Sequence, residues 1–91
     1  MQMNRSTFEE LLRCAQRAGI EVRHASLGGD AGGLAMMRGK RLLVVDKDAD
    51  PEDQLERTVA ALKVVPGFTD QPLRADVQQL FAGEGRMPEE A

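Results

Sequence analysis

The chain has 91 residues, a length that suits one small domain. Its formal net charge of −3 excludes a general attraction to nucleic acids or anionic membranes, which clustered Lys and Arg residues would provide. Apolar residues make up 42% of the chain, but only 3 are Phe and none is Trp or Tyr, so the core must be largely aliphatic. Because so small a core contributes little stability by itself, we expect self-association.

The cysteine content and the apolar runs indicate in which compartment the protein is expected. Cys14 is the single cysteine, which excludes an intramolecular disulfide and a cysteine-based structural zinc site. The polar and acidic start of the sequence does not have the form of a signal peptide. No apolar run approaches the roughly eighteen residues of a membrane span. We expect a cytoplasmic protein that binds neither nucleic acid nor membrane.

The first predicted element is a helix bounded by Ser6 and Gly19. Ser6-Thr7-Phe8-Glu9 has the form of a capping box, in which the Ser oxygen accepts a hydrogen bond from an early backbone N–H and Glu reaches back. Gly19 suits the left-handed conformation that ends many helices. The apolar residues recur at helical spacing, at Phe8, Leu11, Leu12, Ala15 and Ala18.

Three strands are predicted next. Residues 20–25 alternate, with Ile20, Val22 and His24 on one face, which indicates a half-buried strand. Two further strands follow at residues 34–38 and 41–46.

The second and third strands form a predicted hairpin. Gly39-Lys40 joins them, and glycine in the first position of a two-residue loop favours a type II′ turn. Residues 42–45 are apolar on both faces, so we place this strand in the centre of the sheet. The sequence therefore predicts a three-stranded antiparallel or mixed sheet.

Two helices complete the domain. Asp50 is the predicted N-cap of the second helix and Pro51 its first residue, and Pro66-Gly67 ends it. Its apolar stripe is Leu55, Val59, Leu62 and Val65. The third helix is expected from Pro72 to Ala82, ended by Gly83, with an apolar stripe at Leu73, Val77, Leu80 and Phe81.

The predicted architecture is an α+β domain over residues 1–83, in the order α-β-β-β-α-α. Helices should cover one face of the sheet, because that arrangement buries every apolar stripe. Residues 84–91 are expected to be a flexible charged tail.

The segment Ser26–Lys40 contains five glycines and ends in Gly-Lys, so we compared it with a phosphate-binding loop. Such a loop requires Gly, four residues, then Gly-Lys-Ser/Thr before a helix. Leu34 stands where the first glycine is needed, Arg41 stands where the hydroxyl is needed, and a strand follows. The spacing of Gly28–Gly33 does not fit a dinucleotide fingerprint either. We expect a mobile glycine turn.

Asp46, Asp48 and Asp50 alternate as in a calcium-binding loop. Pro51 and Arg57 replace the required Gly and bidentate Glu, so capping by Asp50 is the favoured role. No metal and no cofactor are predicted.

Two other residues, His24 and Cys14, have side chains of types that act in catalysis. His24 is expected to be a partly buried, hydrogen-bonded ring, and the alternative is a general base working with Ser26 or Asp30. Cys14 is expected to pack in the core.

The pair Met36-Met37 places one methionine on each face of a strand. One should be in the core, and the other should be available to a partner because Met side chains adapt to varied surfaces. The expected interaction surface combines this pair with the glycine turn and consists of Gly29, Asp30, Gly32, Gly33, Met36, Met37, Arg38 and Lys40.

Residues 32–65, GGLAMMRGKRLLVVDKDADPEDQLERTVAALKVV, resemble a stretch of the zincin-like metallopeptidases of the ImmA/IrrE type. In that family a hairpin and an acidic loop lead into a helix that carries H-E-x-x-H. At the matching positions this chain has Ala61, Leu62 and Val65, so it lacks both ligand histidines and the catalytic glutamate. The resemblance implies a scaffold retained for binding.

The sequence thus leads to three functional hypotheses. The first is a small non-catalytic protein that acts through protein–protein contacts with an unidentified partner or as a homodimer. The second is a small-ligand or anion-binding domain that uses the N–H groups of loop 28–33, with charge from Arg23, Arg38 or Lys40. The third is an enzyme that uses His24.

Overall fold

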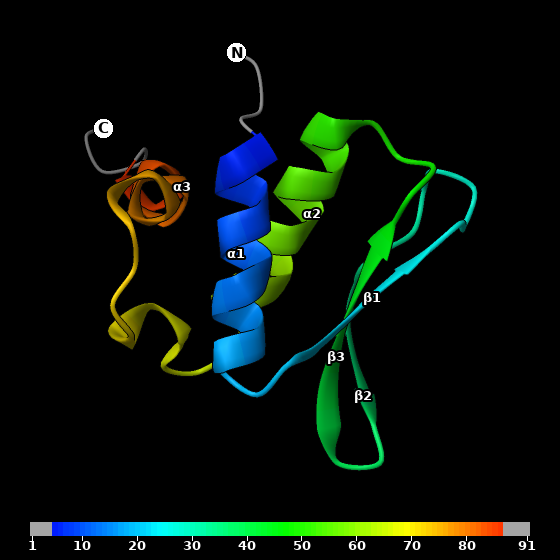
Figure 1. Cartoon of the computed structure of the whole chain (residues 1–91), viewed down its shortest axis with the longest axis horizontal. Helices are drawn as coiled ribbons and strands as arrows, with labels where there is room; N and C mark the ends of the chain where they lie inside the picture. Colours follow the sequence, from blue (N-terminus) through cyan, green and yellow to red (C-terminus); the bar gives the residue numbers. More distant parts are fainter. Residues whose placement is uncertain (1–4, 87–91) are drawn as a thin grey trace.

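The computed structural model describes the backbone of residues 5–86 and the side chains as far as residue 82. It confirms the α+β class and the predicted element order (Figure 1). A short 3₁₀ helix, η1, which the sequence did not predict, precedes the last helix. The elements are α1 (Arg5–Arg17), β1 (Glu21–Ala25), β2 (Gly33–Met37), β3 (Lys40–Asp46), α2 (Pro51–Lys63), η1 (Phe68–Asp70) and α3 (Ala75–Arg86).

The sheet is mixed and has the order β1-β3-β2. β3 is parallel to β1 and antiparallel to β2, so it lies in the centre as predicted. Leu43 pairs with Val22 on one side and with Leu34 on the other, and these three side chains share one face of the sheet. Leu43 and Val45 of that face are buried against the helices, and Leu42 on the opposite face is buried as well, so β3 carries buried apolar side chains on both faces.

The helices gather on one side of the molecule and the sheet on the other (Figure 1). α1 contacts β1, α2 contacts β2 and β3, and α3 packs against α1 and α2. The largest fully buried apolar side chains are Leu11, Leu43, Leu62 and Val77, one from each of these helices and one from the central strand. Within residues 5–86 no helix has the length and apolar character needed to cross a membrane.

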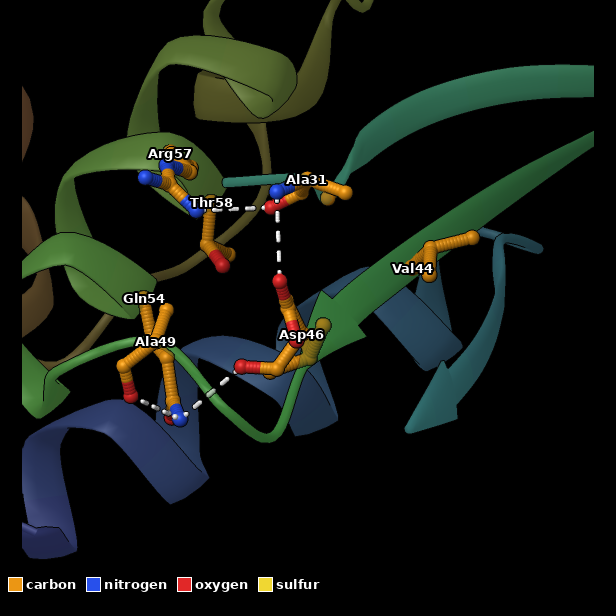
Figure 2. Close-up of a pocket in the computed structure, with 9 residues that line it drawn as sticks. Ala31, Val44, Asp46, Ala49, Gln54, Arg57 and Thr58 are labelled. Carbon is orange, nitrogen blue, oxygen red and sulfur yellow. Dashed lines mark hydrogen bonds between the residues drawn. The ribbon is translucent and has the colours of Figure 1, made fainter. Parts of the chain in front are cut away.

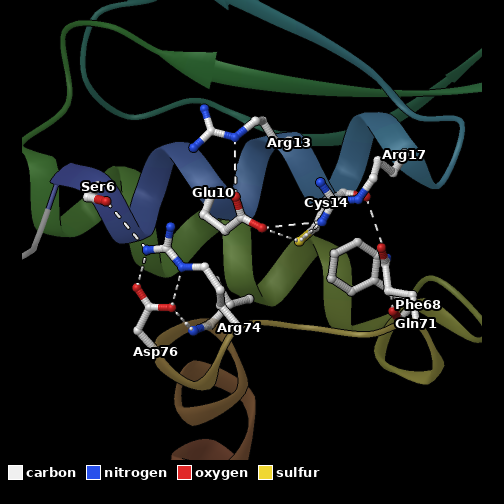
Figure 3. Close-up of polar contacts among 10 residues, drawn as sticks. Ser6, Glu10, Arg13, Cys14, Arg17, Phe68, Gln71, Arg74 and Asp76 are labelled. Atoms are coloured by element: carbon white, nitrogen blue, oxygen red, sulfur yellow. Dashed lines mark hydrogen bonds and ion pairs between the residues drawn. The ribbon is translucent and has the colours of Figure 1, made fainter.

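Polar contacts between residues far apart in sequence attach α3 to α1 (Figure 3). The Thr7 hydroxyl donates a hydrogen bond of 2.7 Å to the Asp76 carboxylate. The Arg74 guanidinium lies 2.6 Å from the same carboxylate and donates to the Ser6 hydroxyl at 3.4 Å. These hydrogen bonds, from Arg74 first and then Thr7, hold the pKa of Asp76 well below its usual range. The start of α3 is therefore fixed by side chains of α1.

Several predicted element boundaries need correction. α1 begins at Arg5, so Ser6 lies in its first turn and does not occupy the N-cap position. Asp50 occupies the N-cap position of α2 in extended conformation, but its side chain forms no capping hydrogen bond. α2 ends at Lys63, before Pro66.

α3 differs at both ends from the prediction. It begins at Ala75 instead of Pro72, and the Arg74 carbonyl accepts its first backbone hydrogen bond from Gln78 at 2.9 Å. The helix continues through Gly83 to Arg86, because a glycine inside a helix costs only about 1 kcal/mol. The remainder of the predicted tail, residues 87–91, lies outside the described residues.

The hairpin is confirmed, but its turn lies one residue earlier than predicted. Met37 pairs with Lys40, so the two-residue loop is Arg38-Gly39. Both loop residues have positive φ, 54° and 80°, which defines a type I′ turn instead of type II′. Arg38 therefore adopts a left-handed conformation that costs energy for a residue with a Cβ.

Candidate functional site

The carboxylate of Asp46 organises the end of the sheet where β1 and β3 finish. Its side chain is only 2% exposed and accepts four backbone hydrogen bonds (Figure 2 shows one of them). The donors are the N–H groups of Leu27 at 2.9 Å, Gly29 at 2.7 Å, Ala31 at 3.1 Å and Asp48 at 3.0 Å. Burial raises the pKa of Asp46, but the four N–H donors outweigh it and lower the pKa from 3.8 to about 2.

Residues 26–32, which we call the glycine loop, wrap around this carboxylate. From the other side the Arg57 guanidinium donates to the carbonyl oxygens of Gly29 at 3.0 Å and Ala31 at 2.7 Å, and Figure 2 shows the bond to Ala31. The N–H of Gly28 donates to the Asp48 carboxylate at 2.9 Å. The glycine loop is therefore bonded to three side chains, in place of the mobile turn expected from its composition.

Gly32 lies where the glycine loop approaches β3 most closely. Its φ is +109°, and a Cβ at this position would lie 3.2 Å from the carbonyl oxygen of Val44. Only glycine meets both conditions without strain. The close approach of the loop to β3 explains why position 32 is a glycine.

This arrangement bears directly on the anion-binding hypothesis. Four N–H groups of the loop already donate hydrogen bonds to the carboxylates of Asp46 and Asp48. The donors are Leu27, Gly28, Gly29 and Ala31. The space enclosed by the glycine loop, β3 and α2 leaves no room for a water molecule. An external anion would therefore have to displace Asp46 and Asp48.

The residues of the expected interaction surface fall into two groups along β2. Gly29, Asp30 and Gly32 lie beside the carboxyl end of β3, and Gly33 begins β2. The remaining four residues, Met36, Met37, Arg38 and Lys40, lie at the opposite end of β2. β2 runs from Gly33 to Met37, four residue steps that span about 13 Å of extended chain.

Both methionines are exposed, Met36 by 63% and Met37 by 49%. The expectation that one of them lies in the core is wrong. Met36 does share the helix-facing side of the sheet with Leu34, but the hairpin extends beyond the helices (Figure 1). Leu34 packs against the core, but Met36, nearer the turn, stays 63% exposed, so alternation along the strand does not by itself produce burial.

His24 is exposed, and within residues 5–86 its ring forms no hydrogen bond or ion pair, even with Ser26 or Asp30. The expected partly buried, hydrogen-bonded ring is therefore wrong. Cys14 is fully buried as expected, 3.1 Å from an Arg17 nitrogen (Figure 3). Burial raises the pKa of the Cys14 thiol, which keeps it protonated at neutral pH.

A groove that the sequence did not reveal lies between α1, the ends of β1 and β3, and the start of α2. It has a volume of about 340 Å³, and its lining includes Arg5, His24 and Lys47. These three residues come from distant parts of the chain and belong to no recognisable motif. The only sequence signal was the position of His24 on the helix-facing side of its strand.

Ala61, Leu62 and Val65, which stand at the catalytic positions of the metallopeptidase pattern, are buried in the apolar core. Among the described residues, no group of three or more His, Cys, Asp or Glu side chains is placed to hold a metal ion. No family model, no curated protein and no solved structure matches the chain. The resemblance to the metallopeptidases stays a prediction from the sequence pattern.

Proposed function

We propose that this protein is non-catalytic and acts through protein–protein contacts in the cytoplasm, using the outer edge of β2 and the turn that follows it. The observation that carries the proposal is the exposure of Met36 and Met37, by 63% and 49%, on opposite faces of one edge strand. An apolar side chain on each face allows a partner strand to gain contacts on both sides of the sheet.

The backbone of β2 supports the same conclusion. β2 pairs with β3 along one edge, and no other described strand pairs with it. An unpaired edge presents a row of N–H and C=O groups to which an extended segment can add as a further strand. Ala35, in the middle of this edge, is exposed and too small to obstruct a neighbouring strand.

The charges at the two ends of β2 favour a second copy of the chain as the partner. Asp30 lies exposed in the glycine loop three residues before β2, and the basic Arg38 and Lys40 are exposed in the turn after β2 and at the start of β3. Antiparallel pairing of two β2 strands about Ala35 places the acidic end of each copy beside the basic end of the other. Such a contact is self-complementary, as a two-fold interface requires.

The contact should be weak. Two five-residue strands cover less surface than the roughly 1,200–2,000 Å² buried in stable interfaces. We therefore expect a dimer with a dissociation constant of about 1 μM or higher.

Sedimentation equilibrium of the full chain tests this proposal. Asp30→Lys alone and Lys40→Asp alone should each weaken the dimer, because each places like charges together. The double exchange, Asp30→Lys with Lys40→Asp, restores the original net charge and should restore association. Arg13→Glu on α1 is the control, because Arg13 is exposed and remote from β2. A monomer at every concentration, or a double exchange no better than the single variants, would contradict pairing through β2.

A further inference from the structure

The groove between α1, the ends of β1 and β3, and the start of α2 combines an apolar wall with a cationic rim. Phe8, Leu12 and Val45 form the wall, and each also belongs to the core, so the wall is held in place by packing. The volume of about 340 Å³ lies within the range of pockets that take small organic molecules.

The charged groups that line the groove are Arg5, Glu9, His24 and Lys47. Among the described residues that line the groove, Glu9 is the one carboxylate, and it lies 3.6 Å from Arg5 in an exposed pair that contributes little energy. The side chains of Lys47 and His24 form no hydrogen bond or ion pair with any residue in the described part of the chain. The rim therefore carries a positive charge in a chain whose net charge is −3.

The backbone also makes the groove attractive to negative charge. α1 begins at Arg5 and α2 at Pro51, and both residues line the groove, so two 13-residue helices direct their amino ends at it. Helix amino ends attract negative charge. β1 and β3 are parallel, and ligands of parallel sheets commonly lie beyond the carboxyl ends of the strands.

The donors on the rim distinguish between kinds of anion. Pro51 has no N–H, and the side-chain amide of Gln54 donates to the carbonyl oxygens of Asp46 at 3.1 Å and Ala49 at 3.0 Å. Pro51 and the Gln54 side chain therefore supply no free N–H donor of the kind that holds a phosphate. Flexible cationic side chains above an apolar wall suit a carboxylate that carries an apolar tail.

We propose that this groove binds a small organic carboxylate, with the tail against Phe8, Leu12 and Val45 and the carboxylate between Lys47 and His24. This site is separate from the β2 edge and does not depend on the proposed self-association. It also differs from the glycine loop, four of whose N–H groups already donate to Asp46 or Asp48.

Titration of the ¹⁵N-labelled full chain with octanoate, followed by two-dimensional NMR, tests the proposal. Octanoate should cause saturable shifts at groove residues. Octanamide should bind about fivefold more weakly, because it has the same tail without the charge. Octylamine and inorganic phosphate, tested separately, should cause no saturable shifts in the groove. Equal binding of octanoate and octylamine, phosphate binding as tight as octanoate binding, or shifts located elsewhere would overturn the proposal.

Four single substitutions sharpen the test. Lys47→Gln and His24→Gln should each weaken octanoate binding, Lys47→Gln by about fivefold. Glu9→Gln should tighten it by about twofold, because it removes the carboxylate on the rim. Arg13→Gln, which removes one positive charge outside the groove, should leave binding unchanged.

Lys47→Gln should weaken octanoate binding and Glu9→Gln should tighten it. These opposite effects separate a direct contact from damage to the fold, which would weaken binding in every variant. The dispersion of the NMR spectrum shows whether each variant folds. Unchanged binding in folded Lys47→Gln, or weaker binding in Glu9→Gln, would contradict the assignment. Sedimentation in the presence of octanoate should show no change in association, which keeps this result distinct from the test of the β2 edge.

Discussion

Replacement of Gly32 with alanine tests whether the glycine loop is held against β3. The φ of +109° imposes a strain of about 1–3 kcal/mol on any residue with a Cβ. The new Cβ would also lie 3.2 Å from the Val44 carbonyl oxygen and 3.5 Å from the Asp46 nitrogen. Displacement of the loop to relieve this contact should cost about 1 kcal/mol more. We expect Gly32→Ala to lower the free energy of unfolding by about 2–4 kcal/mol.

Gly28→Ala is the matched control. Its φ is +93°, so it has comparable backbone strain, but a Cβ there would meet no atom within 4 Å. The difference between the two variants therefore isolates the close approach of the loop to β3. A difference of about 1 kcal/mol corresponds to about 4–8 °C in melting temperature for a domain of this size.

Urea unfolding followed by far-ultraviolet circular dichroism measures both variants, since the chain has no Trp or Tyr to report by fluorescence. The slope of the free energy against urea concentration shows whether the unfolded states remain comparable. Equal destabilisation by Gly32→Ala and Gly28→Ala would refute the close approach. A Gly32→Ala protein as stable as the wild type would refute the description of the whole loop.

Three further predictions concern the same region and the hairpin. Because the pKa of Asp46 falls from 3.8 to about 2 on folding, its carboxylate stabilises the fold above pH 4, and this contribution is lost as the pH falls from 4 to 2. The difference in unfolding free energy between wild type and Asp46→Asn, measured by urea titration at several pH values, should therefore shrink over this range; a constant difference would contradict the role of the charge. Arg57→Met keeps the apolar stem but removes two hydrogen bonds to the glycine loop, so it should cost about 1–3 kcal/mol and speed amide exchange at Gly29 and Ala31. Unchanged exchange at these two amides would argue against that attachment. Arg38→Asn should raise stability by about 0.5–1 kcal/mol, because Asn tolerates the left-handed φ of 54° and suits a type I′ turn; a lower melting temperature would show that the turn differs from this description.

Local patterns in the sequence predict much of the fold. The helices follow from apolar residues at helical spacing, and Leu43 and Val45 belong to a run that is apolar on both faces, which places β3 in the centre of the sheet. The hairpin also follows from the sequence, but the position of its turn does not. A type I′ turn at Arg38-Gly39 matches the twist of the paired strands, and this preference outweighs the local cost at Arg38.

The site residues were harder to predict, because their roles depend on distant partners. Asp46 has the spacing of a calcium ligand in the sequence, but in the structure four backbone N–H groups surround it. Met36 has the alternation of a buried residue, but the hairpin extends past the helices that would bury it. In each case the role of the side chain depends on the position of residues that are distant in the sequence.

The sequence by itself determined the order of the elements, the central position of β3 and the aliphatic nature of the core, because these depend on the spacing of apolar residues along the chain. Only the tertiary structure decided that the glycine loop closes around Asp46 and Arg57, and that Arg5, His24 and Lys47 share one groove. The parallel pairing of β1 with β3 brings these segments together. No local pattern specifies contacts between residues so far apart in the chain.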